Sequence, residues 1–220
     1  MGDFHPAVEE YLETIYELEE AGIVPMRARI VERLGVSAPA VSETVKRLER
    51  EGYLTLTPDR RMVLSASGRK YATDMVRRHR LAERLLVDVL KVPWHQVHEE
   101  ACRLEHAISD SLEAHLITLL DDPGTCPHGN PIPGSKHPEP AVATVALAAT
   151  EADRDYVVRR IDEVLESNPA GLLLLEDNAL IPGGRLRVDN VGTDGVDVTS
   201  ARGAVTVPKL IAEQVFVTAG

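Results

Sequence analysis

The stretch Met26-Arg-Ala-Arg-Ile-Val-Glu-Arg-Leu-Gly35-Val-Ser37-Ala-Pro39-Ala-Val-Ser42-Glu43-Thr44-Val-Lys-Arg-Leu-Glu-Arg50-Glu-Gly52 decides the fold of the N-terminal part. Apolar residues recur three and four positions apart on both sides of Gly35, which predicts two helices joined by a tight turn. Pro39 stands in the first turn of the second helix, where its missing N–H removes no helical hydrogen bond. This spacing is typical of a helix-turn-helix, whose second helix enters the DNA major groove.

The residues after Gly52 predict a hairpin with a basic tip. Tyr53-Leu-Thr-Leu-Thr and Met62-Val-Leu-Ser read as two short strands, and Pro58-Asp-Arg-Arg61 reads as the turn between them. Such a hairpin after a helix-turn-helix is a wing. The chain has a net charge of −11, but residues 22–91 carry 15 basic and 8 acidic residues. A basic block inside an acidic chain predicts contact with DNA phosphates there.

Length and composition limit the classes of protein to which the chain can belong. Its 220 residues, 44% of them hydrophobic, can bury the cores of one to three small domains. No apolar run approaches the roughly 18 residues of a membrane span, and the N-terminus resembles no signal peptide. Two cysteines do not make a disulfide framework. We therefore expect a soluble cytoplasmic protein without a membrane partner.

A second group of residues has the composition of a metal site. Within His98-Glu-Glu-Ala-Cys102-Arg-Leu-Glu105-His106, the residues His98, Cys102, Glu105 and His106 share one face of a predicted helix. Upstream, His79 and Glu83 lie four residues apart on another helix. Nitrogen, sulfur and oxygen donors together suit a borderline transition metal. A zinc peptidase would need H-E-x-x-H, and Cys102 occupies the place of the second histidine. We expect no enzyme and no small-molecule substrate.

The rest of the chain completes a mainly α organisation in three parts, at residues 1–73, 74–140 and 141–220. Helical patterns cover residues 6–20, 69–90, 94–107 and 109–120, and the later ones are apolar on more than one face, as in a homodimer. Residues 121–140 contain six prolines and read as a tether. Cys126 and His128 within it lack two further partners and are expected to be inert.

Short β-like runs mark the C-terminal part as a small barrel. They cover residues 141–149, 185–188, 196–199 and 214–218, with 154–165 read as a short helix. The prediction is a DNA-binding domain, a helical dimerisation and metal-binding domain, and a β domain.

Several stretches together carry a family resemblance: Tyr16-Glu-Leu-Glu-Glu, Arg27-Ala-Arg-Ile, Val41-Ser, Arg78-His79-Arg-Leu-Ala-Glu83-Arg-Leu-Leu, Val97-His98-Glu-Glu-Ala-Cys102-Arg-Leu-Glu105-His106 and Gly129-Asn-Pro-Ile-Pro-Gly134. Over about residues 5–135 the chain resembles the diphtheria-toxin-repressor family of iron-dependent regulators. The last eighty residues resemble that family's SH3-like domain in length, position and β character. The resemblance implies a homodimeric, divalent-metal-activated repressor that binds operator DNA.

The resemblance also divides the donors into two metal sites. It implies an ancillary site at His79, Glu83 and His98, and a primary, activating site at Glu10, Cys102, Glu105 and His106. On DNA, we expect Ser37, Ala38, Pro39 and Glu43 to face base edges, and Arg27, Ser42, Arg50 and Arg60 to hold phosphates.

Three positions depart from the family pattern. Glu10 stands where iron-responsive members have Met, while Cys102 is retained, so the primary set is a hybrid. Its carboxylate favours Mn(II) and its thiolate favours Fe(II), Co(II), Ni(II) or Zn(II). We expect Fe(II), with a manganese-responsive repressor as one alternative and a DNA-binding protein with a structural zinc as another. In the family the SH3-like domain lends Glu and Gln to the ancillary site, but that pattern is missing near residues 166–171; Glu166 and Asn168 are weak candidates, which leaves open whether this domain contributes a ligand. Glu43 replaces a base-contacting Gln and would favour a cytosine amino group over adenine.

Overall fold

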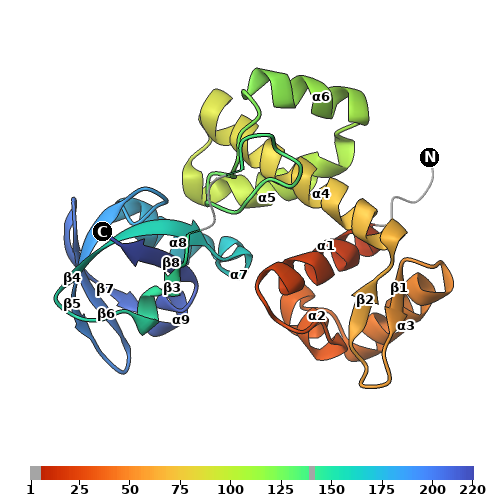
Figure 1. Cartoon of the computed structure of the whole chain (residues 1–220), viewed down its shortest axis with the longest axis horizontal. Helices are drawn as coiled ribbons and strands as arrows, with labels where there is room; N and C mark the ends of the chain where they lie inside the picture. Colours follow the sequence, from red (N-terminus) through yellow and green to blue (C-terminus); the bar gives the residue numbers. More distant parts are fainter. Residues whose placement is uncertain (1–5, 139–141) are drawn as a thin grey trace. The chain divides into compact units, whose positions relative to one another are not determined.

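The computed structural model describes residues 6–138 and 142–220. Two compact units are present, one ending at Arg77 and the other spanning Arg78–Gly220, and helix α4 runs through the boundary between them (Figure 1). The three-part division at residues 73 and 140 stays a prediction.

The N-terminal unit has the element order of a winged helix-turn-helix, as predicted. Its elements are α1 Pro6–Glu20, α2 Arg27–Leu34, α3 Ala38–Arg50, β1 Leu54–Leu56 and β2 Met62–Leu64. Gly35 ends α2 in the left-handed conformation with φ of 64°, which a residue with a Cβ rarely adopts. The Ser37 hydroxyl accepts a hydrogen bond from the Ala40 N–H at 3.4 Å and caps α3. These local signals set the angle at which α3 follows α2.

One apolar core holds the N-terminal unit together. Its fully buried members come from all three helices and the wing: Leu12, Ile15, Ile30, Val41, Val45, Leu48, Leu54 and Met62. The strands of the wing pair antiparallel, with Leu54 opposite Leu64 and Leu56 opposite Met62. The core buries the inner faces of α2 and α3 and leaves the outer face of α3 in solvent.

The helices of the second unit are more broken than the sequence predicts. They are α4 Ala66–Arg84, a π-helical turn Leu85–Val89, a 3₁₀ turn Trp94–Gln96, α5 Val97–Leu104, a 3₁₀ turn Glu105–Ala107 and α6 Asp110–Leu119. In the π-helical turn, the Leu90 N–H reaches the Leu85 carbonyl at 3.1 Å. Such turns insert one residue into a helix and are frequent near functional sites. The predicted helix 94–107 is thus three segments, and Glu105 and His106 lie just after α5.

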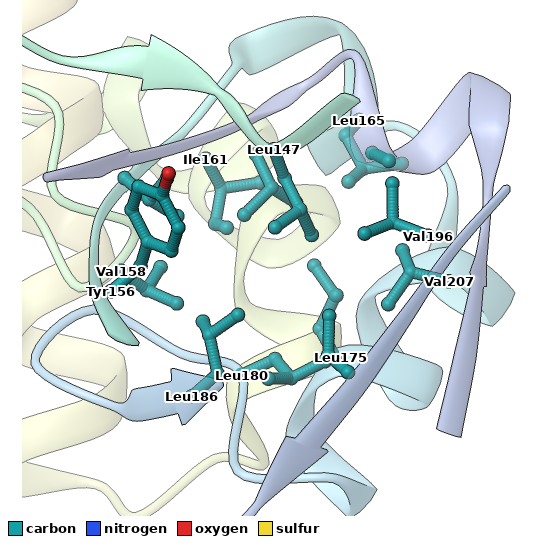
Figure 2. Close-up of a cluster of buried hydrophobic side chains, with 14 of the residues drawn as sticks. Leu147, Tyr156, Val158, Ile161, Leu165, Leu175, Leu180, Leu186, Val196 and Val207 are labelled. Carbon is teal, nitrogen blue, oxygen red and sulfur yellow. The ribbon is translucent and has the colours of Figure 1, made fainter. Parts of the chain in front are cut away.

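The C-terminal part is a six-stranded antiparallel sheet in the order β3-β8-β4-β5-β6-β7. The strands are β3 Val145–Ala146, β4 Arg154–Ile161, β5 Arg185–Val191, β6 Gly195–Ser200, β7 Gly203–Pro208 and β8 Val215–Ala219. Short helices α7 Glu163–Glu166, α8 Pro169–Asp177 and α9 Lys209–Ala212 connect them. Its core includes Leu147, Val158, Leu175 and Val207 (Figure 2). The predicted SH3-like domain fits, and its sheet is not a closed barrel, because the described strands leave β3 and β7 as edges.

Two predictions in this region need correction or restriction. The stretch 154–165 is a strand up to Ile161 rather than a helix, because Tyr156 and Val158 alternate inward with period two. The Asp162 carboxylate then accepts from the Val164 N–H at 3.0 Å and starts α7. The predicted strand 141–149 begins at residue 141, which lies outside the described residues; within it, Val145–Ala146 is a strand. None of the helices in residues 6–138 and 142–220 is long and apolar enough to cross a membrane.

Candidate metal centre and DNA-contact surface

Helix α4 supplies three buried ionisable side chains to the candidate centre. His79, Arg80 and Glu83 are all buried, with Arg80 and Glu83 at 0% exposure. His79 and Glu83 lie one turn apart on one face, and His79 Nε2 is 3.4 Å from Glu83 Oε1. Ionisable groups are rarely buried without a partner or a metal, so this face of α4 marks a functional site.

The segment around α5 brings four predicted ligands to the same place. Cys102 Sγ lies 3.6 Å from His98 Nε2, and the donor atoms of His79, His98 and Cys102 all lie within 4.8 Å of one another. His79 Nδ1 is 2.5 Å from Glu105 Oε2, and the other Glu105 oxygen is 3.4 Å from His106 Nε2. Residues assigned by resemblance to two sites therefore form one connected network of side chains.

Glu166, at the end of α7, completes the set from the β domain. Its side chain is buried, and its Oε2 lies 3.2 Å from His98 Nδ1. The donor atoms of His79, Glu83, His98 and Glu166 lie within 4.8 Å of one another. Asn168, the other candidate, is exposed, and its side chain caps α8 by accepting from the Gly171 N–H at 3.0 Å. Of the two, Glu166 is the residue that the fold places among the candidate ligands.

The proline-rich segment contributes two donors that the sequence analysis expected to be inert. Cys126 and His128 are buried, and His128 Nδ1 lies 3.0 Å from Glu83 Oε1 and 3.3 Å from Glu166 Oε2. These carboxylates are the two further partners that the sequence did not reveal. In the sequence, only the Cys-x-His pair in a loop indicates a metal site here. The pair gains carboxylate neighbours only when Glu83 of α4 and Glu166 of α7 pack against it.

Asn130 and Gly129 fix the position of this segment relative to β4 and α7. Asn130 donates from Nδ2 to Glu166 Oε1 at 2.7 Å and to the Ile161 carbonyl at 3.0 Å. Gly129 has φ of 87°, and a Cβ there would lie 2.1 Å from a backbone oxygen of the adjacent strand β4, so only glycine allows this approach. Asn130 therefore holds one oxygen of Glu166 and leaves the other directed at the histidines.

Arg80 of α4 contacts both the proline-rich segment and α7. Its guanidinium contacts Glu163 Oε1 from Nη2 at 2.7 Å and from Nε at 3.1 Å, and it donates to the Pro131 carbonyl. A fully buried arginine with this pairing connects α4, the proline-rich segment and α7. The ligand-bearing segments are thus tied together by groups that are not ligands themselves.

Several atoms of the buried donors have no hydrogen-bond partner in the described part of the chain. Among the described residues, both carboxylate oxygens of Glu83, Oε2 of Glu166, Nε2 of His79, Nδ1 of His98 and both ring nitrogens of His128 have no hydrogen-bond partner. Several of these atoms lie within ion-pair distance of one another, as His128 Nδ1 and Glu83 Oε1 do at 3.0 Å. Unpartnered buried polar atoms are rare and unfavourable, and metal coordination would satisfy them.

The charges of the network hold protons where a metal would bind. Burial disfavours the imidazolium form most strongly, yet nearby carboxylates and thiols outweigh it and raise the pKa of His79, His98 and His128 well above the usual range. Burial opposes ionisation of Glu83, but the charge of His128 outweighs it and lowers the Glu83 pKa. Burial, reinforced by the Glu83 charge, raises the pKa of the Cys126 thiol to about 12. A divalent ion would displace these protons and take over their electrostatic role.

The donor chemistry fits a borderline transition metal. Imidazole and thiolate suit Fe(II), Co(II), Ni(II) or Zn(II), whereas Mg²⁺ and Ca²⁺ prefer oxygen ligands. Glu10, the remaining predicted ligand, lies on α1 of the N-terminal unit and its side chain is exposed. Its membership of the primary site stays a prediction.

The predicted DNA contacts lie on the N-terminal unit and are accessible. Six of them are exposed, from the start of α3, its outer face, its end and the tip of the wing: Ser37, Ala38, Pro39, Glu43, Arg50 and Arg60. Arg27 and Ser42 are half-buried. The Ser37 hydroxyl already caps α3, so its contribution to DNA contact would compete with that hydrogen bond.

Comparison with known proteins places the chain in a family. Residues 3–62 match the family "Iron dependent repressor, N-terminal DNA binding domain", and residues 65–134 match "Iron dependent repressor, metal binding and dimerisation domain". The chain is 41% identical to the iron-dependent repressor IdeR of Mycobacterium tuberculosis over 227 residues, covering 99% of both chains. It is 44% identical to the diphtheria toxin repressor of Corynebacterium diphtheriae over 173 residues, covering 76% of both.

Solved structures agree with these matches. A manganese-dependent transcriptional repressor in complex with manganese superposes with a TM-score of 0.83 at 33% identity, covering 97% of this chain and 100% of the other. The IdeR of T. acidophilum superposes with a TM-score of 0.77 at 29% identity and full coverage of both chains. With DNA-binding and metal-binding domains both matched, the chain belongs to the family of iron-dependent repressors.

Proposed function

We propose that this protein is a transcriptional repressor that binds operator DNA as a dimer when it is loaded with Fe(II), and so controls genes of metal homeostasis. The observation that carries the proposal is a pair of overlapping donor groups in a chain that also carries a winged helix-turn-helix: buried or half-buried His79, Glu83, His98 and Glu166 form one group, and His79 and His98 form the other with half-buried Cys102. The family match supplies dimerisation and DNA binding. Acting on operator DNA is consistent with a cytoplasmic protein.

The metal ligands are proposed in two groups. Cys102, Glu105 and His106, with Glu10 from α1, form the activating site, and His79, Glu83 and His98 form the ancillary site, to which Glu166 adds a carboxylate. The metal supplies a positive charge and directed bonds to donors from separate segments. Support for the ancillary group is that its donor atoms lie within 4.8 Å of one another.

The effect on DNA follows from joining α1 to the dimerisation part. If the ion takes Glu10 together with the donors around α5, it fixes the first helix and sets the separation of the two recognition helices in a dimer. Without the ion, carboxylates beside a thiol repel one another and the connection loosens. Moving such an equilibrium from 1:99 to 99:1 needs about 5.5 kcal/mol of differential binding, which a four-ligand transition-metal site can supply.

A manganese-responsive repressor is the second candidate, and Glu10 favours it because carboxylates suit Mn(II). Cys102 favours iron, and so do His98 and His79, whose donor atoms lie within 4.8 Å of its sulfur. Thiolate and imidazole bind Fe(II) more tightly than Mn(II). Because Glu10 and Cys102 favour different metals, the metal that activates this protein has to be measured directly.

The test is operator binding as a function of free metal. Duplexes recovered from a randomised pool by the Fe(II)-loaded protein serve as the probe, and anisotropy is measured anaerobically with Fe(II), Mn(II) and Zn(II) at matched free concentrations. We expect tight binding with Fe(II), weaker binding with Mn(II) at the same free concentration, and loss of binding with chelator. A Cys102→Ala variant should lose the metal dependence, while the exposed His137→Ala variant keeps it.

Affinity for DNA that is unchanged by chelator and by Cys102→Ala would instead identify a DNA-binding protein with a structural metal. Activation by Mn(II) at lower free concentration than by Fe(II) would support the manganese-responsive alternative.

A further inference from the structure

Strand β4 has an irregularity near its C-terminal end. Its pairing with β8 shifts register between Val158 and Arg160, so Arg159 is the extra residue of a β-bulge. Without the bulge, the alternation of a strand would turn Arg160 to the same face as the fully buried Val158. With it, Ile161 takes the inward position at 0% exposure, and Arg160 remains half-buried. The bulge therefore keeps an arginine out of the core of the β domain.

The proline-rich segment lies against the same bulge. The Ile161 N–H donates to the His128 carbonyl at 2.8 Å. A Cβ on Gly129 would lie 2.1 Å from the Arg159 carbonyl oxygen, so the two backbones are in close contact. These contacts hold Asn130, the next residue of the segment, beside the bulge.

The Asn130 carboxamide connects the bulge to the candidate metal centre. Its Oδ1 accepts a hydrogen bond from Arg160 Nη1 at 3.2 Å, and its Nδ2 donates to Glu166 Oε1 at 2.7 Å. The same Nδ2 donates to the Ile161 carbonyl at 3.0 Å. Asn130 is 0% exposed, and turning its amide over would set its oxygen against two acceptors and its NH₂ against a guanidinium. Each of the three contacts therefore selects the orientation in which Asn130 donates to Glu166.

The Arg160 guanidinium is itself held in place by two neighbours. Its Cζ lies 4.2 Å from the centroid of the Phe216 ring, which stands opposite Arg160 on β8. A guanidinium over an aromatic face is a favourable arrangement. Arg160 Nη1 also lies 3.6 Å from Asp162 Oδ2, and the Asp162 side chain caps α7. Phe216 and Asp162 thus restrict the guanidinium to a position from which it donates to Asn130.

We propose that Arg160 is a positioning residue for the metal centre, which fixes the Asn130 amide and through it the Glu166 carboxylate. This inference rests on the proposed function, in which Glu166 adds a carboxylate to the ancillary site. Asn130 engages Glu166 Oε1, and the other oxygen, Oε2, lies 3.2 Å from His98 Nδ1. Groups that hydrogen-bond to a metal ligand orient it, and their loss typically lowers metal affinity by about tenfold to a hundredfold. Arg160 acts one residue farther from the ion.

The charge of Arg160 separates positioning from electrostatics by the sign of the effect. A guanidinium near a divalent ion repels it, so removal of the charge alone should raise metal affinity. Loss of positioning should lower metal affinity, because Glu166 then also adopts orientations that do not bind the ion. A fall in affinity on removing Arg160 is therefore opposite to the effect of its charge.

The first measurement is Co(II) affinity of the full-length protein, by competition with a chromophoric chelator. Arg160→Leu should weaken binding by about threefold to tenfold, and Arg160→Lys, which keeps a donor, should weaken it less. In the Asn130→Ala background, Arg160→Leu should change the affinity by less than about twofold, because the residue through which it acts is missing. Arg159→Leu is the matched control: this adjacent arginine donates to Thr218 at 2.9 Å, and its loss should leave the Co(II) affinity unchanged.

The Asn130 side-chain amide gives a second measurement that needs no metal. In proton–nitrogen correlation spectra of the metal-free protein, its signal is identified by its absence from Asn130→Ala. Arg160→Leu should shift this signal and speed its exchange with solvent, whereas Arg159→Leu should leave both unchanged. Near-ultraviolet circular dichroism identifies any variant that fails to fold, and in that case the milder Arg160→Lys carries the comparison.

A Co(II) affinity in Arg160→Leu that equals or exceeds that of wild type would overturn the proposal. So would an equal loss in the wild-type and Asn130→Ala backgrounds, which would assign the effect to Asp162 and the start of α7. Operator binding is measured separately. Metal-dependent operator binding with unaltered Co(II) affinity in Arg160→Leu rejects the positioning role alone. A fall in Co(II) affinity that depends on Asn130, in a protein whose DNA binding ignores metal, rejects the proposed function.

Discussion

The two units of this protein keep their functional groups in opposite environments. In the N-terminal unit, the predicted DNA contacts are mostly in solvent and the interior is apolar, with Ile30, Val41 and Leu48 at 0% exposure. In the second unit, functional groups lie in the interior beside an apolar core: His79, Arg80, Glu83 and His128 are all buried. A DNA surface needs only a correctly shaped scaffold beneath it, whereas a metal centre must be assembled from buried charges.

This difference changes what a substitution does. A substitution on the surface of α3 alters DNA binding and leaves the fold intact, since surface substitutions usually change the free energy of unfolding by less than about 0.5 kcal/mol. Inside the second unit it removes a partner from a charge in a low-dielectric interior, which is strongly destabilising. Binding and folding are therefore separable in the N-terminal unit and coupled around the metal centre.

The largest effect should come from Arg80, the buried non-ligand. Arg80→Leu leaves Glu163 buried without its guanidinium partner and should lower the free energy of unfolding by about 3–5 kcal/mol. Urea unfolding can be followed by fluorescence of Trp94, the single tryptophan, which lies in the core of the β domain. Arg103→Leu, which removes exposed ion pairs on α5, is the control and should change stability by less than about 1 kcal/mol.

A double variant sharpens this result. Arg80→Leu with Glu163→Leu removes both charges and should be less destabilised than Arg80→Leu alone, because an apolar pair leaves no unpartnered charge. If Arg80→Leu and Arg103→Leu were equally mild, the contrast between a buried and an exposed charge network would not hold.

Asn130 should have the next largest effect, on metal affinity. Asn130→Ala removes the donor that fixes Glu166 Oε1, a hydrogen bond to a charged group contributing about 1.5–3 kcal/mol. Affinity for Co(II) should fall by about tenfold to a hundredfold, measured by competition with a chromophoric chelator. Asn178→Ala is the matched control, because that amide donates at 2.8 Å to the Leu174 carbonyl, within a helix. Equal Co(II) affinities in the two variants would show that Glu166 needs no positioning.

Glu43 should change specificity without changing stability. Glu43→Gln can donate to adenine as well as accept, so preference between adenine and cytosine at the contacted position should shift by about 1–3 kcal/mol. Affinities for duplexes differing at that base, at one fixed salt concentration, measure the shift. Arg60→Ala is the comparison: as a phosphate contact it should weaken all duplexes alike and reduce the salt slope by about one. A uniform loss in Glu43→Gln would remove this residue from base recognition.

The smallest effect concerns Asp74, a partly exposed acid on α4. Burial opposes its ionisation, but Lys70 at 2.5 Å and Arg77 at 2.9 Å outweigh it and lower the Asp74 pKa. A lowered folded-state pKa stabilises the fold above the unfolded value of about 3.9 and loses that contribution as pH falls through the folded value. Asp74→Asn should therefore lower stability by under about 1 kcal/mol at neutral pH.

The same difference between Asp74→Asn and wild type should shrink progressively below about pH 3.9. Urea unfolding at neutral and at acid pH measures it. A difference that is the same at both pH values would mean that Asp74 acts through packing and not through its charge.

Local patterns were sufficient for the winged helix-turn-helix. Gly35, Ser37 and Pro39 set a turn, a cap and a helix start through their own backbone preferences, and the structure shows the elements expected from them. The π-helical turn after Arg84 and the 3₁₀ turn at Glu105 were not foreseen, because packing against other segments overrides a continuous helical pattern. Arg154–Ile161 is a strand and not the predicted helix because it pairs with β5 and β8, which are distant in sequence.

By itself, the sequence determined which residues could bind a metal and which helix could read DNA, because helical spacing places such side chains on common faces. Only the tertiary structure decided which donors meet. Glu83 and Glu166 lie 83 positions apart, and Cys126 and His128 stand between them in a loop without helical periodicity. No local sequence pattern connects these segments. They are held together by the buried contacts of Arg80 and Asn130. Buried charges and polar groups are unfavourable unless each has a partner, so the segments must come together as a set.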